Sequence, residues 1–438
     1  MIRVGAFLCG CSVVRVVDPK LFEDALKYLP GGVTYGVRYL DPLPVYVLKA
    51  QGPYVFDVLG RKYVDYWMGH GALLMGHNYG PVIEAAIEQL REGAHFGYPH
   101  PWEVRWAKQV CSMVPSVKKV RPTNSGTEAN MYAVRVARAY TGRKLVGKIE
   151  GGWHGGYDGL QIGVTYPIDK PSSLGIPEET TANTLLLPYN DLDGVEKRIK
   201  GKQLAAIVVE PVLGAGGFIS ADVEYLKGLR EICDRDGIVL IFDEVITGFR
   251  LAPGGAQQLF GVVPDMTVLG KSVGGGPFPA GAFGGREDIM EVLDQTKREN
   301  FYERVFHGGT YSGNPLTMRA GYVLLKELEK GEVYGRLERL GQKARKGLEE
   351  ALAPLGAYIT GIGSLVCIHF TKEKPRDIHT ANRTKDVKLT VEFSKTLVKN
   401  GILFVPPHNP HLFISAAHSE EDVDKLIEAA ELFVKPRL

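Results

Sequence analysis

Four short motifs in this chain carry residues whose types and spacing could do chemistry. In chain order they are Asn-Ser-Gly-Thr-Glu at 124–128, Gly-Trp-His-Gly at 152–155, Phe-Asp-Glu at 242–244 and Gly-Lys-Ser at 270–272. They offer, in turn, donors for a phosphate, an aromatic face, a carboxylate and an amine nucleophile. Each motif alone is a weak signal, whereas the four in this order are a strong one.

The first motif predicts a phosphate site at the start of a helix. The run from Ser125 to Tyr140 has a helical pattern, and Ser125 and Glu128 have the spacing of a capping box. A helix start presents unpaired N–H groups, Gly126 permits close approach, and the hydroxyls of Ser125 and Thr127 can donate. A plain helix cap is the alternative interpretation.

The second motif places two ring side chains after a short strand expected at 145–149. Trp153 and His154 stand among glycines, where an indole could cover one face of a flat cofactor ring. A core tryptophan at a glycine-rich turn is the alternative, and it is favoured if this motif is taken alone.

The third and fourth motifs supply the charged groups. Asp243 ends the apolar run 238–242, so we expect its carboxylate at the C-terminal edge of a sheet, where a protonated pyridine nitrogen could pair with it. An ion pair with Arg250 or a helix cap is the alternative. Lys271 follows an apolar strand and precedes glycines, a poorly solvated setting that favours a nucleophilic amine over a surface lysine.

Together these groups match the needs of pyridoxal phosphate: a phosphate cradle, a stacking face, a carboxylate for the ring nitrogen and a Schiff-base lysine. Two nucleotide-binding motifs are excluded, because each lacks a glycine that the motif requires. Asp265 stands where a P-loop ending at Gly270 needs its first glycine. Ile219 occupies the third glycine position of a dinucleotide fingerprint that would begin at Gly214.

Alternating strands and helices must position these residues. The apolar runs 205–209 and 238–242 predict strands buried on both faces, and the helical spacing over 223–236 predicts a parallel crossover between them. Shorter strands are expected at 54–57 and 63–66.

The pattern changes after the middle of the chain, where longer charged helices begin. The last helix is expected to start at a Ser419 cap. We therefore expect a large cofactor-binding domain at 75–325, a small C-terminal domain at 326–438, and an N-terminal segment, 1–74, that packs with that small lobe.

Composition limits the function classes. The 438 residues carry 52 basic and 50 acidic side chains, which gives no electrostatic support for a nucleic-acid or membrane partner. Five scattered cysteines argue against a disulfide framework, and Cys9-x-Cys11 lacks a second ligand pair, so no metal is expected. The apolar leader at 1–17 has no convincing cleavage site, and we expect a cytoplasmic protein.

Further runs extend the pattern from about Pro30 to the C-terminus. They include Glu-Pro-Val at 210–212, Gly-Ala-Phe-Gly-Gly at 281–285 and the run at 309–316. With the four motifs, the chain resembles the class III pyridoxal-phosphate-dependent aminotransferases of fold type I, and within them glutamate-1-semialdehyde aminomutase and its transaminase relatives. The resemblance implies an α/β fold: a large domain with a mainly parallel seven-stranded sheet flanked by helices, plus a smaller α+β lobe from both terminal segments.

The resemblance also implies residue roles. Lys271 would be the catalytic Schiff-base lysine that moves the proton, and Asp243 would hold the pyridine nitrogen. Trp153 would stack on the ring with Val245 on its other face, and Thr310 would reach the phosphate from a neighbouring subunit, which implies a homodimer with a shared site. The implied cofactor-binding residues are Ser125, Gly126, Thr127, Trp153, His154, Glu210, Asp243, Val245, Lys271 and Thr310.

The departures from the aminomutase pattern concern the substrate. Tyr35, Arg38 and His70 are the candidate substrate residues; the arginine is retained, but Tyr35-Gly36 replaces a serine-proline pair and His70 replaces a tryptophan. Ala215 stands where an asparagine is expected, and Pro410 stands where the aminomutase has a glutamate that contacts the substrate amine.

These substitutions order the functional hypotheses. An isomerase must retain a diamino intermediate, and losing polar contacts should let it escape, so a transaminase moving an amino group from an amino acid or amine to a keto acid, aldehyde or ketone is favoured. Glutamate-1-semialdehyde 2,1-aminomutase is the alternative, and an amino-acid racemase or a non-catalytic cofactor-binding protein are lesser ones.

Overall fold

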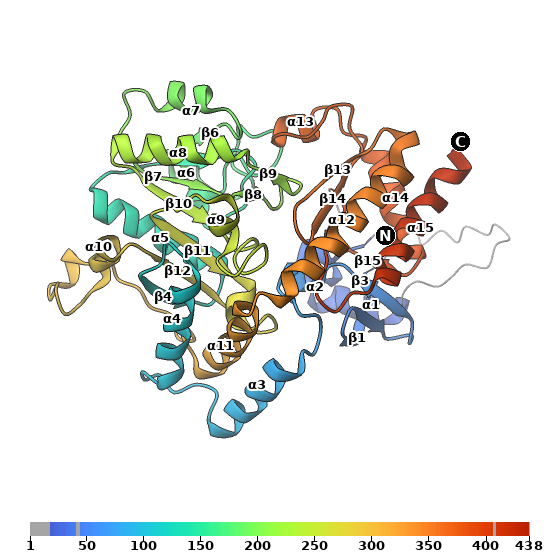
Figure 1. The fold of residues 1–438 in the computed structure, drawn as a ribbon, viewed down its shortest axis with the longest axis horizontal. Coiled ribbons are helices and arrows are strands. Elements are labelled where there is room, and N and C mark those ends of the chain that lie inside the picture. The colour runs from blue at the N-terminus through green and yellow to red at the C-terminus, as the bar shows by residue number, and fades with distance from the viewer. Residues whose placement is uncertain (1–17, 41–43, 406–408, 438) are drawn as a thin grey trace.

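The computed structural model describes residues 18–40, 44–405 and 409–437. The leader at 1–17, with Cys9 and Cys11, lies outside the described residues. Figure 1 shows two bodies of secondary structure: a sheet with helices on both faces, built from the middle of the chain, and a smaller group that holds both terminal parts.

The larger body is built on a seven-stranded sheet. Its spatial order is β4 (Lys119–Thr123), β12 (Gly281–Gly285), β11 (Met266–Gly270), β10 (Val239–Asp243), β7 (Leu204–Val209), β5 (Leu145–Ile149) and β6 (Thr184–Leu187). The pairs from β11 to β6 are all parallel, whereas β12 runs antiparallel to both of its neighbours. The predicted mainly parallel seven-stranded sheet of a fold type I enzyme is confirmed.

Helices cover both faces of this sheet because its central strands are apolar on both sides. On β10, Val239 and Ile241 belong to the core beneath α5 (Gly126–Thr141), whereas Leu240 and Phe242 belong to the core beneath α8 (Val223–Asp236). Every residue of β7 and β10 is buried. The predicted crossover at 205–242 is therefore present with parallel strands.

Strand β12 was not predicted, because three of its five residues are glycine. The glycines allow close packing that side chains would prevent. A Cβ at Gly281 would lie 2.2 Å from the carbonyl oxygen of Ser125, and one at Gly284 would lie 2.7 Å from that of Lys119. The strand therefore brings the start of α5 against the sheet.

The remaining helices of this body lie around the sheet or lead into it. They are α3 (Gly80–Glu92), α4 (Pro101–Met113), α6 (Glu178–Thr181), α7 (Leu192–Ile199), α9 (Gly255–Phe260), α10 (Glu287–Met290) and α11 (Pro315–Glu329). A two-stranded ribbon, β8 (Val212–Leu213) with β9 (Ile219–Ser220), follows β7.

In the smaller body, segments from the two ends of the chain share a sheet. Strands β1 (Val47–Gln51), β2 (Tyr54–Asp57) and β3 (Lys62–Asp65) form an antiparallel meander, and β15 (Ile402–Leu403) pairs parallel with β3. The N-terminal strands thus pack with the C-terminal lobe. The exact domain division at residues 74 and 325 stays a prediction.

The C-terminal lobe has a second sheet and three long helices. The sheet contains β13 (Tyr358–Thr360), β14 (Leu365–His369) and β16 (His411–Phe413); the helices are α12 (Glu332–Leu352), α14 (Val387–Lys399) and α15 (Glu420–Val434). Ser419 caps α15 as predicted, in a capping box with Asp422. Shorter helices at its edges are α1 (Pro19–Tyr28), α2 (Met68–Gly71) and α13 (Ile378–Asn382).

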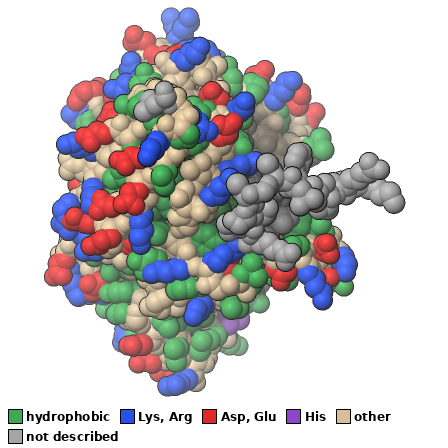
Figure 2. All heavy atoms as spheres, turned by 90° about the vertical axis from the view of Figure 1, so that its right-hand side faces the viewer, with side chains coloured by type: hydrophobic (Ala, Val, Ile, Leu, Met, Phe, Trp, Pro, Cys, Tyr) green, Lys and Arg blue, Asp and Glu red, His purple; other side chains and the backbone are tan. Residues whose placement is uncertain are grey.

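The face of the molecule on the side of this lobe carries both signs of charge. Figure 2 shows acidic and basic side chains interspersed on it, with no field of a single sign. Among the described residues, no helix is long and apolar enough to cross a membrane.

Candidate active site

Asp243, the last residue of β10, is the centre of a buried hydrogen-bond cluster. Its Oδ2 accepts from Asn130 Nδ2 on α5 and from His154 Nδ1, both at 2.8 Å, and its Oδ1 accepts from the backbone N–H of Val245 at 3.0 Å. The alternative ion pair with Arg250 is wrong. The Arg250 guanidinium instead donates to Gly71 O, Ser364 Oγ and Ile414 O and so ties the sheet to the smaller body.

Lys271 directly follows β11, the neighbour of β10 in the sheet, at the same carboxyl edge as Asp243. Its backbone is left-handed, with φ of 52°, a conformation that costs a non-glycine residue free energy and aims the side chain specifically. Burial lowers the pKa of Lys271 from its usual 10.5 to about 8, although the negative charges of Asp243 and Glu210 oppose this shift. The amine is therefore far more available as a nucleophile than a surface lysine.

Glu210 follows β7 and positions two loops of the site. Its Oε1 accepts from the backbone N–H of Trp153 at 2.7 Å, and its Oε2 accepts from that of Gly214 at 3.0 Å. Burial, together with the charge of Asp243, raises the pKa of Glu210 to about 8. Both carboxylate oxygens are engaged with backbone groups, so this residue shapes the site rather than presenting a free charge to it.

The predicted phosphate loop begins α5. Ser125 is the N-cap, and its Oγ accepts from Glu128 N at 3.2 Å. The other half of the predicted capping box is shifted by one residue, since Glu128 Oε2 accepts from Asn124 N at 2.7 Å instead of from Ser125 N. Thr127 Oγ1 accepts from Gly156 N at 3.0 Å, which joins this loop to the Trp-His loop.

Val245 lies between the phosphate loop and the lysine strand. A Cβ on Gly126 would come within 2.9 Å of Val245 Cγ2, and a Cβ on Gly270 would come within 2.9 Å of Val245 Cγ1. Two motifs separated by more than a hundred residues thus each need a glycine because of this one side chain.

The two ring residues of the second motif have different environments. Trp153 is 41% exposed, so its indole is available at the surface of the site. His154 is fully buried, its pKa is lowered by burial, and its Nδ1 donates to Asp243. The sequence predicted both as cofactor-binding residues. In the structure His154 hydrogen-bonds Asp243, whereas the backbone N–H of Trp153 donates to Glu210.

Thr310 is exposed, in the loop that precedes α11. This loop lies near the phosphate loop of the same chain, since Asn124 Nδ2 donates to Ser312 Oγ at 3.3 Å. A contact from a neighbouring subunit stays a prediction.

The three predicted substrate residues line one cavity of about 690 Å³. Tyr35 precedes the short turn η2 (Gly36–Arg38) and Arg38 ends it; His70 lies in α2, with its ring centroid 6.0 Å from that of Tyr35. Trp67, which sequence reasoning missed, lines the same cavity and donates from Nε1 to His70 Nδ1 at 2.8 Å. The only feature of the sequence that could have pointed to Trp67 was an aromatic side chain three positions before His70.

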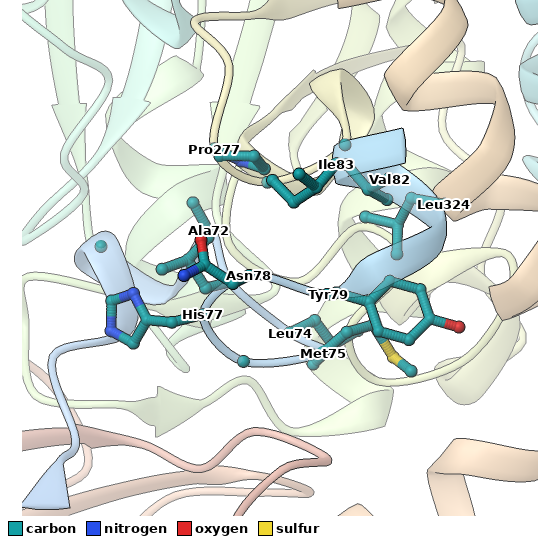
Figure 3. Close-up of a pocket in the computed structure, with 15 residues that line it drawn as sticks. Ala72, Leu74, Met75, His77, Asn78, Tyr79, Val82, Ile83, Pro277 and Leu324 are labelled. Carbon is teal, nitrogen blue, oxygen red and sulfur yellow. The ribbon is translucent and has the colours of Figure 1, made fainter. Parts of the chain in front are cut away.

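A second cavity, of about 360 Å³, lies beside the segment from Ala72 to Ile83. Figure 3 shows Tyr79, Val82 and Leu324 around it, with Pro277 on its far wall. None of the predicted site residues lines this cavity, so it is not part of the predicted site. No cluster of histidine, cysteine or acidic residues suited to a metal ion occurs within the described parts of the chain.

The chain matches the aminotransferase class-III family over residues 35–430. It belongs to the class III aminotransferase family. Glutamate-1-semialdehyde 2,1-aminomutase of Aquifex aeolicus is 42% identical, with 95% of this chain and 99% of that protein covered. Among solved structures, an omega-transaminase from Sphaerobacter thermophilus aligns with a TM-score of 0.88 at 35% identity, covering 95% of this chain and 96% of that one. A transaminase with PLP bound gives a TM-score of 0.86 at 32% identity, covering 95% and 96%.

This class III aminotransferase uses pyridoxal phosphate, and its residues fit that cofactor. Asp243 is a buried carboxylate at the sheet edge, held in position by three N–H donors. Lys271 supplies an amine of lowered pKa, and α5 presents its N-terminus with a glycine as first residue. Asn130, also missed from the sequence as a site residue, lies one turn after Gly126 and reaches Asp243 from that helix.

The family membership leaves the reaction open in one respect. The names of the curated relatives favour an aminomutase over a general transaminase, whereas the structural relatives above are transaminases. These comparisons give no support to an amino-acid racemase.

Proposed function

We propose that this class III aminotransferase is an intermolecular transaminase, which moves an amino group from an amino acid or amine to a keto acid, aldehyde or ketone. The bound cofactor supplies a carbonyl for the substrate amine and an electron-accepting ring. Lys271 Nζ then holds and moves the proton at the substrate carbon, and Asp243 keeps the ring nitrogen charged.

The observation that carries this proposal is the residue at position 410. The resemblance places a glutamate there in aminomutases, but Pro410 is buried ahead of β16, and its carbonyl accepts from Ile368 N at 3.3 Å. The carboxylates that act most strongly on Lys271 are Asp243 and Glu210, and both already accept backbone or side-chain N–H groups. Pro410 has no carboxylate with which to hold a substrate amine during an internal exchange.

Glutamate-1-semialdehyde 2,1-aminomutase is the second candidate, because relatives of that name share 41–42% identity over at least 94% of this chain. A homodimer with a shared site and a cytoplasmic location are further parts of the proposal, supported by the family resemblance of Thr310 and by the scattered cysteines.

One assay separates the two candidates. The enzyme loaded with pyridoxal phosphate receives glutamate 1-semialdehyde without any other acceptor, and 5-aminolevulinate is measured. Catalytic formation would establish the aminomutase. A transaminase gives no sustained product there, yet amine donors supplied alone convert the cofactor absorbance to that of the pyridoxamine form, and a keto acid restores it.

A further inference from the structure

The cavity of about 690 Å³ that Tyr35, Arg38 and His70 line has both apolar and polar walls. We call it the substrate-side cavity. Its apolar lining comes from residues such as Val33, Val55 and Leu403, and its polar lining comes from Thr34, Arg38, Asp65, His70 and His77. This combination suits a ligand with both an apolar group and a charged or hydrogen-bonding group.

The Trp67 indole fixes the protonation pattern of His70. An indole N–H can only donate, and it points at His70 Nδ1 from 2.8 Å. Nδ1 must therefore hold a lone pair, and the single proton of the neutral ring stands on Nε2. The rings meet edge to face, with centroids 5.1 Å apart at 83°, which sets the direction of the imidazole as well.

Backbone conformation and hydrogen bonds fix the turn that carries Trp67 and His70. Gly69 and His70 both adopt left-handed conformations, with φ of 59° and 58°. Asp65 Oδ1 accepts from the N–H of Trp67 at 2.8 Å and of Met68 at 3.3 Å, while its Oδ2 lies 2.7 Å from His77 Nε2. The turn that carries His70 is thus anchored to β3.

The charged groups that act on the pKa of His70 are cationic, and the Asp65 carboxylate that lines the same cavity is engaged by His77. Burial is the main cause that lowers the pKa of His70 to about 4, and the charges of Lys271, His411 and Arg38 act in the same direction. The ring is therefore a neutral N–H donor at neutral pH. Arg38 donates to Thr34 Oγ1 at 2.7 Å, and within the described residues it has no ion pair with a carboxylate.

We infer that His70 is a specificity-determining residue: with its proton held on Nε2 by Trp67, it donates beside Arg38 to the carboxylate of an amino-acid substrate whose bulky apolar group fills the cavity. Trp67 is a positioning residue. A carboxylate has two oxygens, so the cationic Arg38 can donate to one and the neutral His70 can donate to the other. This inference rests on the proposed function for its account of the substrate class.

The same geometry excludes another role. A neutral imidazole with Nδ1 already accepting and Nε2 protonated has no lone pair for a substrate proton. His70 is therefore a donor to bound substrate and not a general base.

A binding experiment that needs no turnover tests the inference. The probe is 3-phenylpropanoate, an unreactive acid with an apolar ring, and its neutral match is 3-phenylpropan-1-ol; the dissociation constants of both for the holoenzyme are measured by calorimetry. Trp67→Phe keeps the ring edge but removes the N–H, and Trp102→Phe on α4 is the control. We expect Trp67→Phe to weaken the acid about tenfold, the worth of one charge-assisted hydrogen bond, and to leave the alcohol unchanged.

Replacements of His70 give a second measurement. His70→Asn suits the left-handed backbone but does not reach the position of Nε2, whereas His70→Gln can place an amide N–H there. We expect His70→Asn to raise KM for aromatic amino-acid donors about tenfold more than for amines without the carboxylate, with kcat largely kept and partial rescue by His70→Gln.

Equal weakening of acid and alcohol in Trp67→Phe, or an unchanged acid-to-amine ratio in His70→Asn, would overturn the inference. Failure of the proposed function looks different. In that case no donor converts the cofactor in the wild-type enzyme, while the acid probe still binds and still responds to Trp67→Phe.

Discussion

His154 Nδ1 lies 2.8 Å from Asp243 Oδ2, although the two residues are 89 positions apart in the chain. Neither side chain is accessible to solvent beyond 2%. The histidine donates to the same oxygen that Asn130 bonds, so a carboxylate that is expensive to bury has fixed donors around it. Within the described residues, Asp243 Oδ1 accepts one N–H, that of Val245, so it keeps acceptor capacity for the expected cofactor ring nitrogen.

Asp243→Asn tests this arrangement. The amide cannot keep the ring nitrogen protonated, and its NH₂ group would confront the donors of His154 and Asn130. We expect kcat to fall by about 100-fold or more, as for the loss of one preorganised electrostatic contact, while pyridoxal phosphate still binds. Stopped-flow turnover and cofactor absorbance check this; an unchanged rate would mean that another group holds the nitrogen.

Lys271→Ala removes the nucleophilic amine. We expect the variant to bind pyridoxal phosphate without the absorbance of the lysine-bound cofactor and to lose at least about 100-fold in turnover, since proton transfer loses its positioned group. Lys297→Ala, at an exposed lysine paired with Glu291, is the matched control. Substantial turnover in Lys271→Ala would refute the assignment.

The lowered pKa of Lys271 predicts a pH dependence. The amine is protonated below its pKa of about 8 and is a free nucleophile above it. The rate at which the cofactor-free enzyme captures pyridoxal phosphate should therefore rise about tenfold per pH unit below 8 and then level off. Because the charge of Asp243 raises this pKa, Asp243→Asn should move the midpoint to lower pH. A rate that is flat from pH 6.5 to 9 contradicts the prediction.

Gly126→Ala should disturb the phosphate loop through Val245. The added Cβ would lie 2.9 Å from Val245 Cγ2, which is too close without movement. We expect a loss of about 1–3 kcal/mol in stability and weaker cofactor retention, as for an overpacked core. The double variant with Val245→Ala should recover part of the stability in thermal unfolding. Additive losses would show that the contact is not the cause.

Thr310→Ala tests the shared active site. If Thr310 reaches the phosphate of a neighbouring subunit, the variant should release pyridoxal phosphate faster, and dilution should worsen the release as subunits separate. Fluorescence of the cofactor over a dilution series measures this. Thr296→Ala, in an exposed loop where the hydroxyl bonds Asp294, is the control. Wild-type retention at every concentration would remove Thr310 from the site.

Local patterns in the sequence determined much of this protein. The apolar runs at 205–209 and 238–242 became buried strands almost residue for residue, because a strand covered on both faces is apolar along its length. The residues of the four motifs also followed from local chemistry, since a helix start, a strand end and a glycine turn each expose particular groups.

Only the tertiary structure decided which of these residues meet. A search for hydrophobic patterns does not find strand β12, because three of its residues are glycines that let neighbouring backbones approach closely. The bonds of His154 and Asn130 to Asp243, and of Trp67 to His70, depend on how β10, α5 and α2 pack and turn. The sequence states which groups are available; the packing of distant segments sets their distances, their burial and therefore their protonation.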